Sequence, residues 1–210
     1  DESHPTIRLI ENRRQADHGD RLAVEEYREG QIADALARLD QAGKVVRCGS
    51  AGEAFDAMAA DWYASRLQGG VDPMIAGPNS TRRALNERAR VLLAAAGELT
   101  GEPLEVNGRS FQIGEQIVCR RNARHLTGVA GEFVKNGSVG TVRRIDHKAG
   151  SMTVEFDAEG TVTLPAKYIN SGHIDYGYAR TTYGVQGQTH RHARYLPTDL
   201  SGFEEGYVAL

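Results

Sequence analysis

The sequence predicts an α/β protein in which a largely parallel sheet carries an inserted, small antiparallel β barrel. Up to about residue 107, short apolar runs alternate with amphipathic helical patterns, as is typical of parallel sheets with helices on their faces. From residue 108 to 171, short β segments follow one another with turn signals between them and no helical pattern. The expected organisation is one α/β domain made of residues 1–107 and 172–210, with residues 108–171 as the inserted barrel.

Composition excludes several classes of protein. The 210 residues carry a formal net charge of −3, with 40% hydrophobic and 25% charged residues, so a buried core is expected and general disorder is not. No apolar run approaches the ~18 residues of a membrane span, so no membrane association is expected. Cys48 and Cys119 are too few for a zinc site of their own or for a disulfide framework.

The first part of the chain has clear helix signals. Helices are expected at about 19–29 and 31–42, with Gly43 as a stop. Ser50 and Glu53 form a capping box that opens another helix, and Ser80 is expected to cap the next one. Short apolar runs predict strands at residues 6–10, 44–48 and 73–76.

The β-rich part is divided by turn signals at Asn136-Gly137 and Glu159-Gly160. Expected β segments are residues 113–119, 138–145, 151–156 and 161–164. A further strand is expected at 174–182, followed by a turn at 184–187.

Positive charge is concentrated in the predicted insert. Residues 108–171 hold nine basic and six acidic side chains, whereas the rest of the chain is net acidic. The cations cluster at Arg120, Arg121, Arg124 and His125. A basic cluster can attract a phosphate backbone, although a solvated loop is the plainer alternative.

A self-contained nucleotide hydrolysis site is not evident in the sequence. The one Gly-Lys pair, Gly43-Lys44, is followed by Val45 and lacks the earlier glycine of a P-loop. No apolar strand ends in an acidic pair that could hold Mg²⁺. The histidine pairs of the C-terminal region lack a third convergent ligand, so no metal site is predicted.

Three segments could nevertheless meet phosphate groups. Arg13 and Arg14 follow the first predicted strand, where the ligand-binding edge of a parallel sheet is expected. The 77–82 segment starts a helix, and the 178–189 segment is polar and follows a strand. A surface salt bridge, simple helix capping and an ordinary turn remain the respective alternatives.

Taken in order, these segments resemble the C-terminal part of a superfamily 1 DNA helicase of the RecD-like branch. The resemblance is nearest to the helicase half of conjugative relaxases of the TraA/TrwC type, and it covers nearly the whole chain. It rests on Glu11-Asn-x-Arg-Gln15, Arg28-Glu-Gly30, the 74–90 block, the 111–168 segment with its Asn136-Gly137 and Gly140-Thr-Val142 signatures, the 178–189 segment and the final 206–210 segment.

The resemblance implies the second RecA-like motor domain of a cytoplasmic bacterial helicase, a P-loop NTPase fold without its P-loop, and an SH3-like inserted barrel. The intact enzyme would be an ATP-dependent 5′–3′ DNA helicase using ATP and Mg²⁺, with the Mg²⁺ ligands outside this chain. Its expected partners are single-stranded DNA and a preceding RecA-like domain of the same protein.

The resemblance also assigns roles to residues. Arg14 would act catalytically by contacting the γ-phosphate of ATP. The nucleotide-binding set would be Asn12, Arg14, Gln15, Gln186, Gly187 and Thr189. The DNA-binding set would be Asn79, Thr81, Arg120, Arg121, Arg124, Thr181 and Tyr183.

Two departures from the family pattern bear on activity. Tyr183 stands where the family usually has His, and Gly184 where Lys or Arg is common. The sequence ends at Leu210, before the arginine that the family uses on the transferring phosphate. The fragment alone is therefore expected not to hydrolyse ATP. The alternatives are a non-catalytic nucleic-acid-binding or scaffolding module that keeps the fold, and an unrelated α/β domain joined to a protein-interaction barrel.

Overall fold

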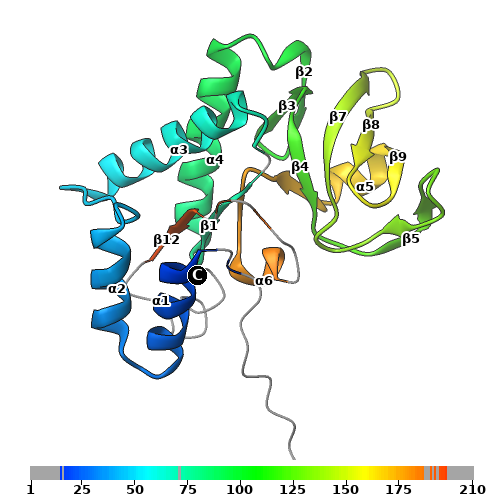
Figure 1. Ribbon diagram of the computed structural model, residues 1–210. Helices are drawn as coiled ribbons and strands as arrows, with labels where there is room; N and C mark the ends of the chain where they lie inside the picture. Colours follow the sequence, from blue (N-terminus) through cyan, green and yellow to red (C-terminus); the bar gives the residue numbers. More distant parts are fainter. Residues whose placement is uncertain are drawn as a thin grey trace, which may run out of the picture.

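The computed structural model describes residues 15, 17–70, 72–186, 190, 192 and 194–197. Figure 1 shows a helical part that contains α1–α4 and a β-rich part on the opposite side, with β1, β12 and α6 between them. Among the described residues, no helix combines the length and apolar character that crossing a membrane requires. The predicted strand at residues 6–10 lies outside the described residues.

The first three helices follow the sequence signals closely. They are α1 (His18–Arg28), α2 (Ile32–Gln41) and α3 (Ala51–Leu67). The predicted capping box is confirmed, because the Ser50 hydroxyl accepts a hydrogen bond from the Glu53 amide at 3.2 Å. The Glu53 carboxylate in turn accepts from the Gly49 amide at 2.9 Å.

Two local predictions in the helical part are wrong. The segment 44–48 forms no strand, because its side chains are mostly exposed and Lys44 and Arg47 form ion pairs with Asp20 and Asp40 instead. Ser80 does not cap the next helix, because α4 (Asn79–Ala95) has Pro78 as its N-cap and Ser80 is already its second residue. Pro78 has no amide hydrogen to satisfy and its φ of −67° suits a helix start.

A small parallel sheet lies at the centre of the fold. It contains β1 (Met74–Ala76), β11 (Ala179–Arg180) and β12 (Arg194–Leu196), in the order β11-β1-β12. Both pairings of β1 are parallel, as the strand–helix alternation predicts. The apolar sides of α3 and α4 join the same core as the strands, through buried Trp62, Leu85 and Leu93. The mixed α/β fold with its parallel sheet is therefore confirmed.

The β-rich part contains an open sheet and two hairpins. The five-stranded antiparallel sheet has the order β10-β4-β7-β8-β9. Its strands are β4 (Gln116–Cys119), β7 (Val139–Asp146), β8 (Ser151–Phe156), β9 (Gly160–Leu164) and β10 (Ile174–Tyr176). The separate hairpins are β2 (Thr100–Val106) with β3 (Arg109–Ile113), and β5 (Ala123–Thr127) with β6 (Phe133–Val134). The short helix α5 (Ala166–Asn170) follows β9.

The expected closed barrel is not found among the described strands. β9 and β10 are the two edges of the five-stranded sheet, and no main-chain pairing joins them. The two hairpins pair only within themselves, so they do not close the ladder. The β character of the insert is confirmed, whereas the SH3-like barrel is not shown.

The strand predicted at 174–182 is divided between the two sheets. Ile174–Tyr176 pairs antiparallel with β4, whereas Ala179–Arg180 pairs parallel with β1. Gly177 lies at the crossing, where a Cβ atom would approach the main chain of Ile117 to 3.0 Å. The division into domains at residues 107 and 172 stays a prediction, but β10 belongs by pairing to the antiparallel sheet.

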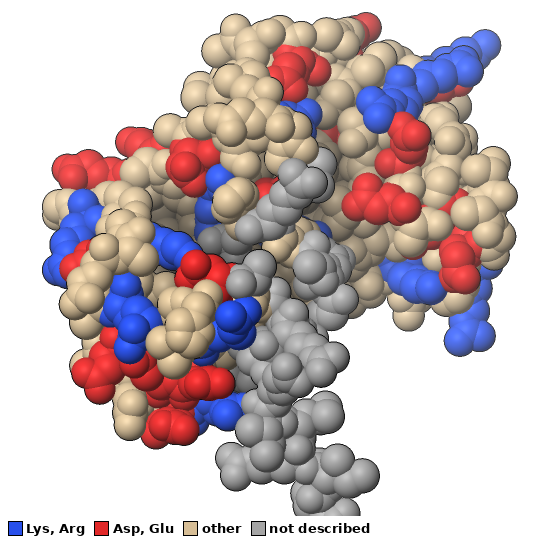
Figure 2. Space-filling view, viewed as in Figure 1, with Lys and Arg blue, Asp and Glu red and all other residues tan. Residues whose placement is uncertain are grey.

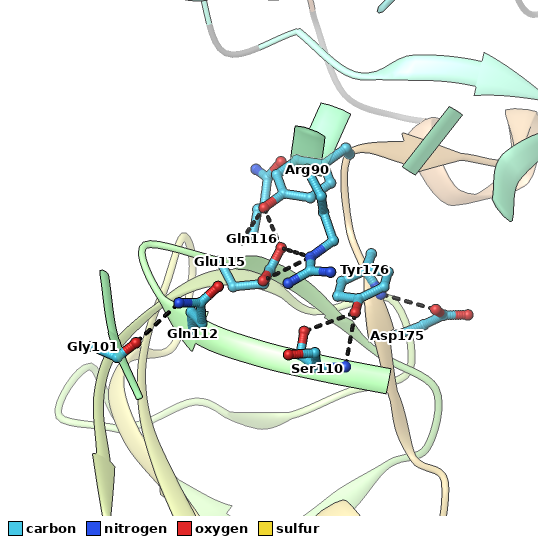
Figure 3. A network of polar contacts seen from close by, with 9 residues as sticks. Arg90, Gly101, Ser110, Gln112, Glu115, Gln116, Asp175 and Tyr176 are labelled. Atoms are coloured by element: carbon cyan, nitrogen blue, oxygen red, sulfur yellow. Dashed lines mark hydrogen bonds and ion pairs between the residues drawn. The ribbon is translucent and has the colours of Figure 1, made fainter. Parts of the chain in front are cut away.

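A buried polar network joins α4 to both sheets (Figure 3). The Glu115 side chain is fully buried, and its two carboxylate oxygens accept from Arg90 Nε at 3.1 Å. The Tyr178 hydroxyl donates to Glu115 Oε1 at 2.6 Å and accepts from the Gln116 amide at 3.2 Å. The Arg90 guanidinium also lies 4.8 Å from the centre of the Tyr176 ring.

Asn86 holds the crossing segment from the same helix. Its carbonyl oxygen accepts from the Ala179 amide at 2.8 Å, and its amide nitrogen donates to the Tyr176 carbonyl at 3.4 Å. Asn86 is 3% exposed, so these bonds lie out of water and their loss would leave buried polar groups unsatisfied. Helix α4 therefore sets the position of β11 and of the residues that follow it.

The Glu115 carboxyl should give stability a recognisable pH dependence. Burial raises its pKa above the ordinary value of 4.5, against the opposing effects of the Tyr178 hydrogen bond and of Arg90. The folded state therefore binds this proton more tightly, so the contribution of Glu115 to stability falls as pH rises above 4.5. In urea titrations between about pH 4 and 7, the unfolding free energy of the wild type minus that of Glu115→Gln should decrease with pH. A constant difference would contradict the raised pKa.

Candidate nucleic-acid interface

Two loops that carry predicted DNA contacts meet at one edge of the parallel sheet. β1 and β11 are adjacent and parallel, with Met74 opposite Ala179 and Ile75 opposite Arg180. Their carboxyl ends therefore point the same way, and ligands of α/β sheets bind at that edge. β1 leads into the N-terminus of α4, and β11 leads into the short helix α6 (Thr182–Val185). We call the residues that follow these two strands, 77–82 and 181–184, the sheet edge.

The α6 side of the sheet edge combines a cap with an exposed aromatic ring. The Thr181 hydroxyl accepts a hydrogen bond from the Gly184 amide at 2.9 Å, so it acts as the N-cap of α6. Tyr183 is 76% exposed, whereas its neighbour Thr182 is 2% exposed. A cap and a buried neighbour hold this turn in place, so the Tyr183 ring is presented to solvent from an ordered turn.

The α4 side presents Asn79 but buries Thr81. The Asn79 side chain is exposed, and its carbonyl oxygen accepts from the Arg82 guanidinium. The amide nitrogen of Asn79 remains able to donate to a phosphate or base oxygen. Thr81 is 7% exposed, so its hydroxyl is less accessible than the predicted DNA contact requires.

Two buried arginines, one within the sheet edge and one directly before it, donate hydrogen bonds to main-chain carbonyls. Neither is among the predicted site residues. Arg82 is 8% exposed and donates to the main-chain carbonyls of Ala76 and Gly77. Arg180 is 7% exposed and donates to the Gly184 carbonyl. Each guanidinium thus bonds to main-chain carbonyls of the same segment of chain, within six residues of its own position. Both lie in segments that the sequence marks as candidate phosphate contacts, 77–82 and 178–189.

Arg180 lies among several ionisable groups. Burial lowers its pKa, the Asp157 carboxylate opposes that effect, and the charge of Arg120 adds to it. Burial also lowers the pKa of His190, whose Nδ1 atom lies 3.5 Å from an Asp72 carboxylate oxygen, and Arg180 lowers it further. Arg120 thus influences the pKa of Arg180, and Arg180 in turn influences the pKa of His190. Arg180, the last residue of β11, is therefore influenced by the charge of Arg120, which follows β4.

The three predicted arginines make different contacts. Arg120 and Arg121 lie in the loop after β4, and Arg124 lies at the start of β5. Arg120 lies 3.6 Å from the Asp175 carboxylate, which also lies 3.4 Å from Arg109. Arg121 Nη1 lies 3.4 Å from the His173 ring. Arg124 lies over the Phe133 ring, 5.8 Å from its centre. The loop is basic and exposed, as predicted, but its cations do not converge on one point.

Charge is unevenly spread over the visible face (Figure 2). Acidic side chains gather at the lower left, over α1 and α2. Lys and Arg side chains occur at the lower right, on the side where Figure 1 draws β5. Side chains of the opposite sign also occur in both regions, so the contrast between the two ends is partial.

The predicted nucleotide-binding set is described only in part. Asn12, Arg14, Gly187 and Thr189 lie outside the described residues. The Gln15 main-chain carbonyl accepts from Arg21 at 3.0 Å, and the Gln186 side chain is exposed directly after α6. The roles of these six residues toward ATP stay predictions. Among the described residues, no group of three or more His, Cys, Asp or Glu is arranged to hold a metal ion.

The fold is similar to that in the crystal structure of Pif1 helicase from Candida albicans, with a TM-score of 0.57 and 12% sequence identity. The similarity covers 94% of this chain and 51% of that one, so this chain spans about half the length of the helicase. No protein-family model matches the sequence, and no curated protein matches it. At this identity the similarity shows that the chain shares a helicase fold.

Proposed function

We propose that this chain is the second RecA-like motor domain of an ATP-dependent DNA helicase and that it binds single-stranded DNA along the sheet edge. The observation that carries the proposal is that Asn79 and Tyr183 are exposed on the two segments that follow the carboxyl ends of β1 and β11, which are adjacent and parallel. The similarity to a helicase over 94% of the chain supports the same function. An exposed aromatic ring beside amide donors and cations suits single-stranded nucleic acid, whose bases stack and whose phosphates accept hydrogen bonds.

In the proposed motor, the nucleotide lies between this domain and a preceding RecA-like domain. Arg14 would contact the γ-phosphate, and Asn12, Gln15, Gln186, Gly187 and Thr189 would complete this side of the pocket. The preceding domain would supply the P-loop and the Mg²⁺ ligands, which this sequence lacks. ATP binding would close the two domains and hydrolysis would reopen them, which moves the strand in the 5′–3′ direction.

The proposal includes a narrower assignment within helicases. The motif order favours the RecD-like branch and a conjugative relaxase of the TraA/TrwC type. The β-rich insert, with Arg120, Arg121 and Arg124, would then lie along the path of the strand. All three arginines of this set are exposed, so they are accessible to a strand.

A non-catalytic nucleic-acid-binding module is the second candidate, and the α6 turn favours it. A Cβ atom at Gly184 would approach the Thr181 hydroxyl to 3.1 Å, so the turn fits glycine better than the cation expected in the family. The two candidates differ in a longer parent protein. Arg14→Ala should abolish its ATPase activity if the chain is a motor domain, whereas a module without motor function shows no ATPase to lose.

Both candidate functions require binding of single-stranded DNA, so a binding experiment distinguishes them from an unrelated function. In fluorescence anisotropy, a labelled oligothymidine should bind in a salt-sensitive manner. Arg120→Ala and Arg124→Ala should each weaken binding and reduce the slope of log affinity against log salt by about 0.7, the value for one phosphate contact on a single strand. The chain alone should show no ATP hydrolysis.

Arg143→Ala is the matched control for these two variants. Arg143 lies in β7 of the five-stranded sheet and forms an exposed ion pair with Glu155 at 2.7 Å. Its loss should leave the affinity and the salt slope unchanged. Equal affinities for all three variants and the wild type would remove the basic loop from the DNA path, and no binding by any of them would refute the proposed function.

A further inference from the structure

A cavity in the β-rich part lies apart from the residues of the sheet edge. It lies between the residues that lead into β5 and the α5 region, and its volume is about 350 Å³. That volume is near the lower end for small-molecule sites, which run from about 300 to 1,000 Å³. We call it the cationic pocket. Its basic and aromatic lining residues are Arg121, His125, Lys167, Tyr168 and His173, and its neutral polar ones are Asn122 and Ser171.

Hydrogen bonds fix the wall of this pocket. The Tyr168 hydroxyl donates to the Arg121 carbonyl at 2.6 Å, and the Arg120 amide donates to the His173 carbonyl at 2.7 Å. The Tyr168 and His173 rings pack edge to face with their centres 5.2 Å apart. Tyr168 is 6% exposed, so it belongs to the core and anchors the lining residues around it.

The polar groups that face the pocket are suited to donate hydrogen bonds. Arg121 and Lys167 carry positive charges, and one ring nitrogen each of His125 and His173 can donate as well. The carbonyl oxygen of Asn122 already accepts from the Asn136 amide at 2.7 Å, which leaves its amide group to donate. The donor set therefore selects a ligand that is rich in acceptors.

No carboxylate balances this charge from within the pocket. No Asp or Glu is among the lining residues. Nearby cations outside the pocket do have acidic partners: Arg120 lies 3.6 Å from Asp175, and Lys135 lies 2.8 Å from Glu132. Arg121 Nη1 instead lies 3.4 Å from His173 Nε2 and donates a hydrogen bond to that ring nitrogen, while the guanidinium has further N–H groups for a ligand.

We propose that the cationic pocket binds a phosphomonoester group, from either the terminal phosphate of a DNA strand or the phosphate of a mononucleotide. A phosphomonoester carries a charge of about −1.5 to −2 and three terminal oxygens. This matches the two fixed cations and the several donors better than the single charge of an internal phosphodiester does. The proposal depends on the β-rich part alone and does not require the motor function.

The strand-end source is tested with three oligothymidines that carry a 5′-phosphate, a 3′-phosphate or hydroxyls at both ends. In fluorescence anisotropy, one phosphorylated oligomer should bind about tenfold more tightly than the hydroxyl form. The mononucleotide source is tested by calorimetric titration with dAMP, with deoxyadenosine as the uncharged comparison. Binding of dAMP without any end preference would identify the free nucleotide as the source.

Two double variants with the same change in net charge distinguish binding in the pocket from nonspecific electrostatic attraction of phosphate to the protein. Arg121→Gln with Lys167→Gln should remove the preference for phosphate, and both side chains are exposed, so the fold should persist by circular dichroism. Arg143→Gln with Lys148→Gln, on the β7–β8 hairpin, should retain it.

Absence of a phosphate preference in both the oligomer and the dAMP experiments would overturn the pocket proposal. So would an equal loss of that preference in both double variants. Binding of the oligomers without a phosphate preference, together with no binding of dAMP, would leave the proposed function standing and refute only the pocket. Conversely, dAMP binding without any oligomer binding would support the pocket and refute the proposed function.

Discussion

Glu115→Ala is expected to lower the free energy of unfolding by about 3–5 kcal/mol, the usual cost of removing one partner from a buried ion pair. The Glu115 side chain is fully buried and accepts hydrogen bonds from Arg90 and from Tyr178. Alanine leaves the Arg90 guanidinium and the Tyr178 hydroxyl without their acceptor, and it leaves a cavity where the carboxylate was. Urea unfolding followed by circular dichroism measures the loss directly.

Glu155→Ala is the matched control for this prediction. Glu155 also pairs with an arginine, at 2.7 Å from Arg143, but both side chains are more than half exposed. Exposed pairs contribute about 0–1 kcal/mol, so this variant should be nearly as stable as the wild type. If Glu115→Ala were no more destabilising than Glu155→Ala, the buried network would not be what holds α4 against the two sheets.

Tyr183→Ala is expected to weaken binding of single-stranded DNA about tenfold. The ring is 76% exposed at the start of α6, and stacking of one base on an aromatic side chain contributes about 1–3 kcal/mol. Because the exposed ring packs against little of the protein, the variant should keep the stability of the wild type. Fluorescence anisotropy with an oligothymidine, at one fixed salt concentration, measures the change.

Two further variants show whether stacking is the cause. Tyr183→Phe keeps the aromatic face and should bind nearly as well as the wild type. Val91→Ala removes an apolar side chain that is 68% exposed in α4, so it controls for the loss of exposed apolar area. Equal affinities of Tyr183→Ala and the wild type would mean that the strand does not pass over α6.

Local signals predicted much of the secondary structure. The capping box at Ser50 and Glu53 places the start of α3, because its hydrogen bonds join residues within four positions of each other. The predicted segment at 151–156 coincides with β8. The hairpin of β2 and β3 was missed although its turn residues, Asn107 and Gly108, have positive φ angles of 51° and 73°. The Asn-Gly pair was the signal that could have revealed it.

The strand predictions that are wrong concern segments whose pairing partners are distant in the sequence. The apolar run at 44–48 has strand character but finds no partner strand, so it stays irregular. The run at 174–182 reads as one strand, yet β4 takes its first half and β1 takes its second. Strand propensity is a local property, whereas pairing depends on which edge is free in the folded molecule.

In the candidate site, too, the sequence predicted individual residues but not the contacts between residues that are distant in the chain. The sequence singled out Asn79 and Tyr183 from their motifs, but it contained no measure of the separation between residues 79 and 183. It passed over Arg82 and Arg180, because the burial of an arginine depends on the side chains packed around it. It also expected Arg120, Arg121 and Arg124 to act together, whereas their contacts lead to Asp175, His173 and Phe133 respectively.

The sequence by itself determined the α/β class, the helices with their caps, the β character of the insert and the concentration of positive charge there. These properties arise from interactions between near neighbours and from composition. Only the tertiary structure decided that the five-stranded sheet stays open, that β10 and β11 belong to different sheets, and that Glu115 is buried under Arg90. Each of those outcomes depends on contacts between residues far apart in the chain, where the competition for burial and for hydrogen-bond partners is settled.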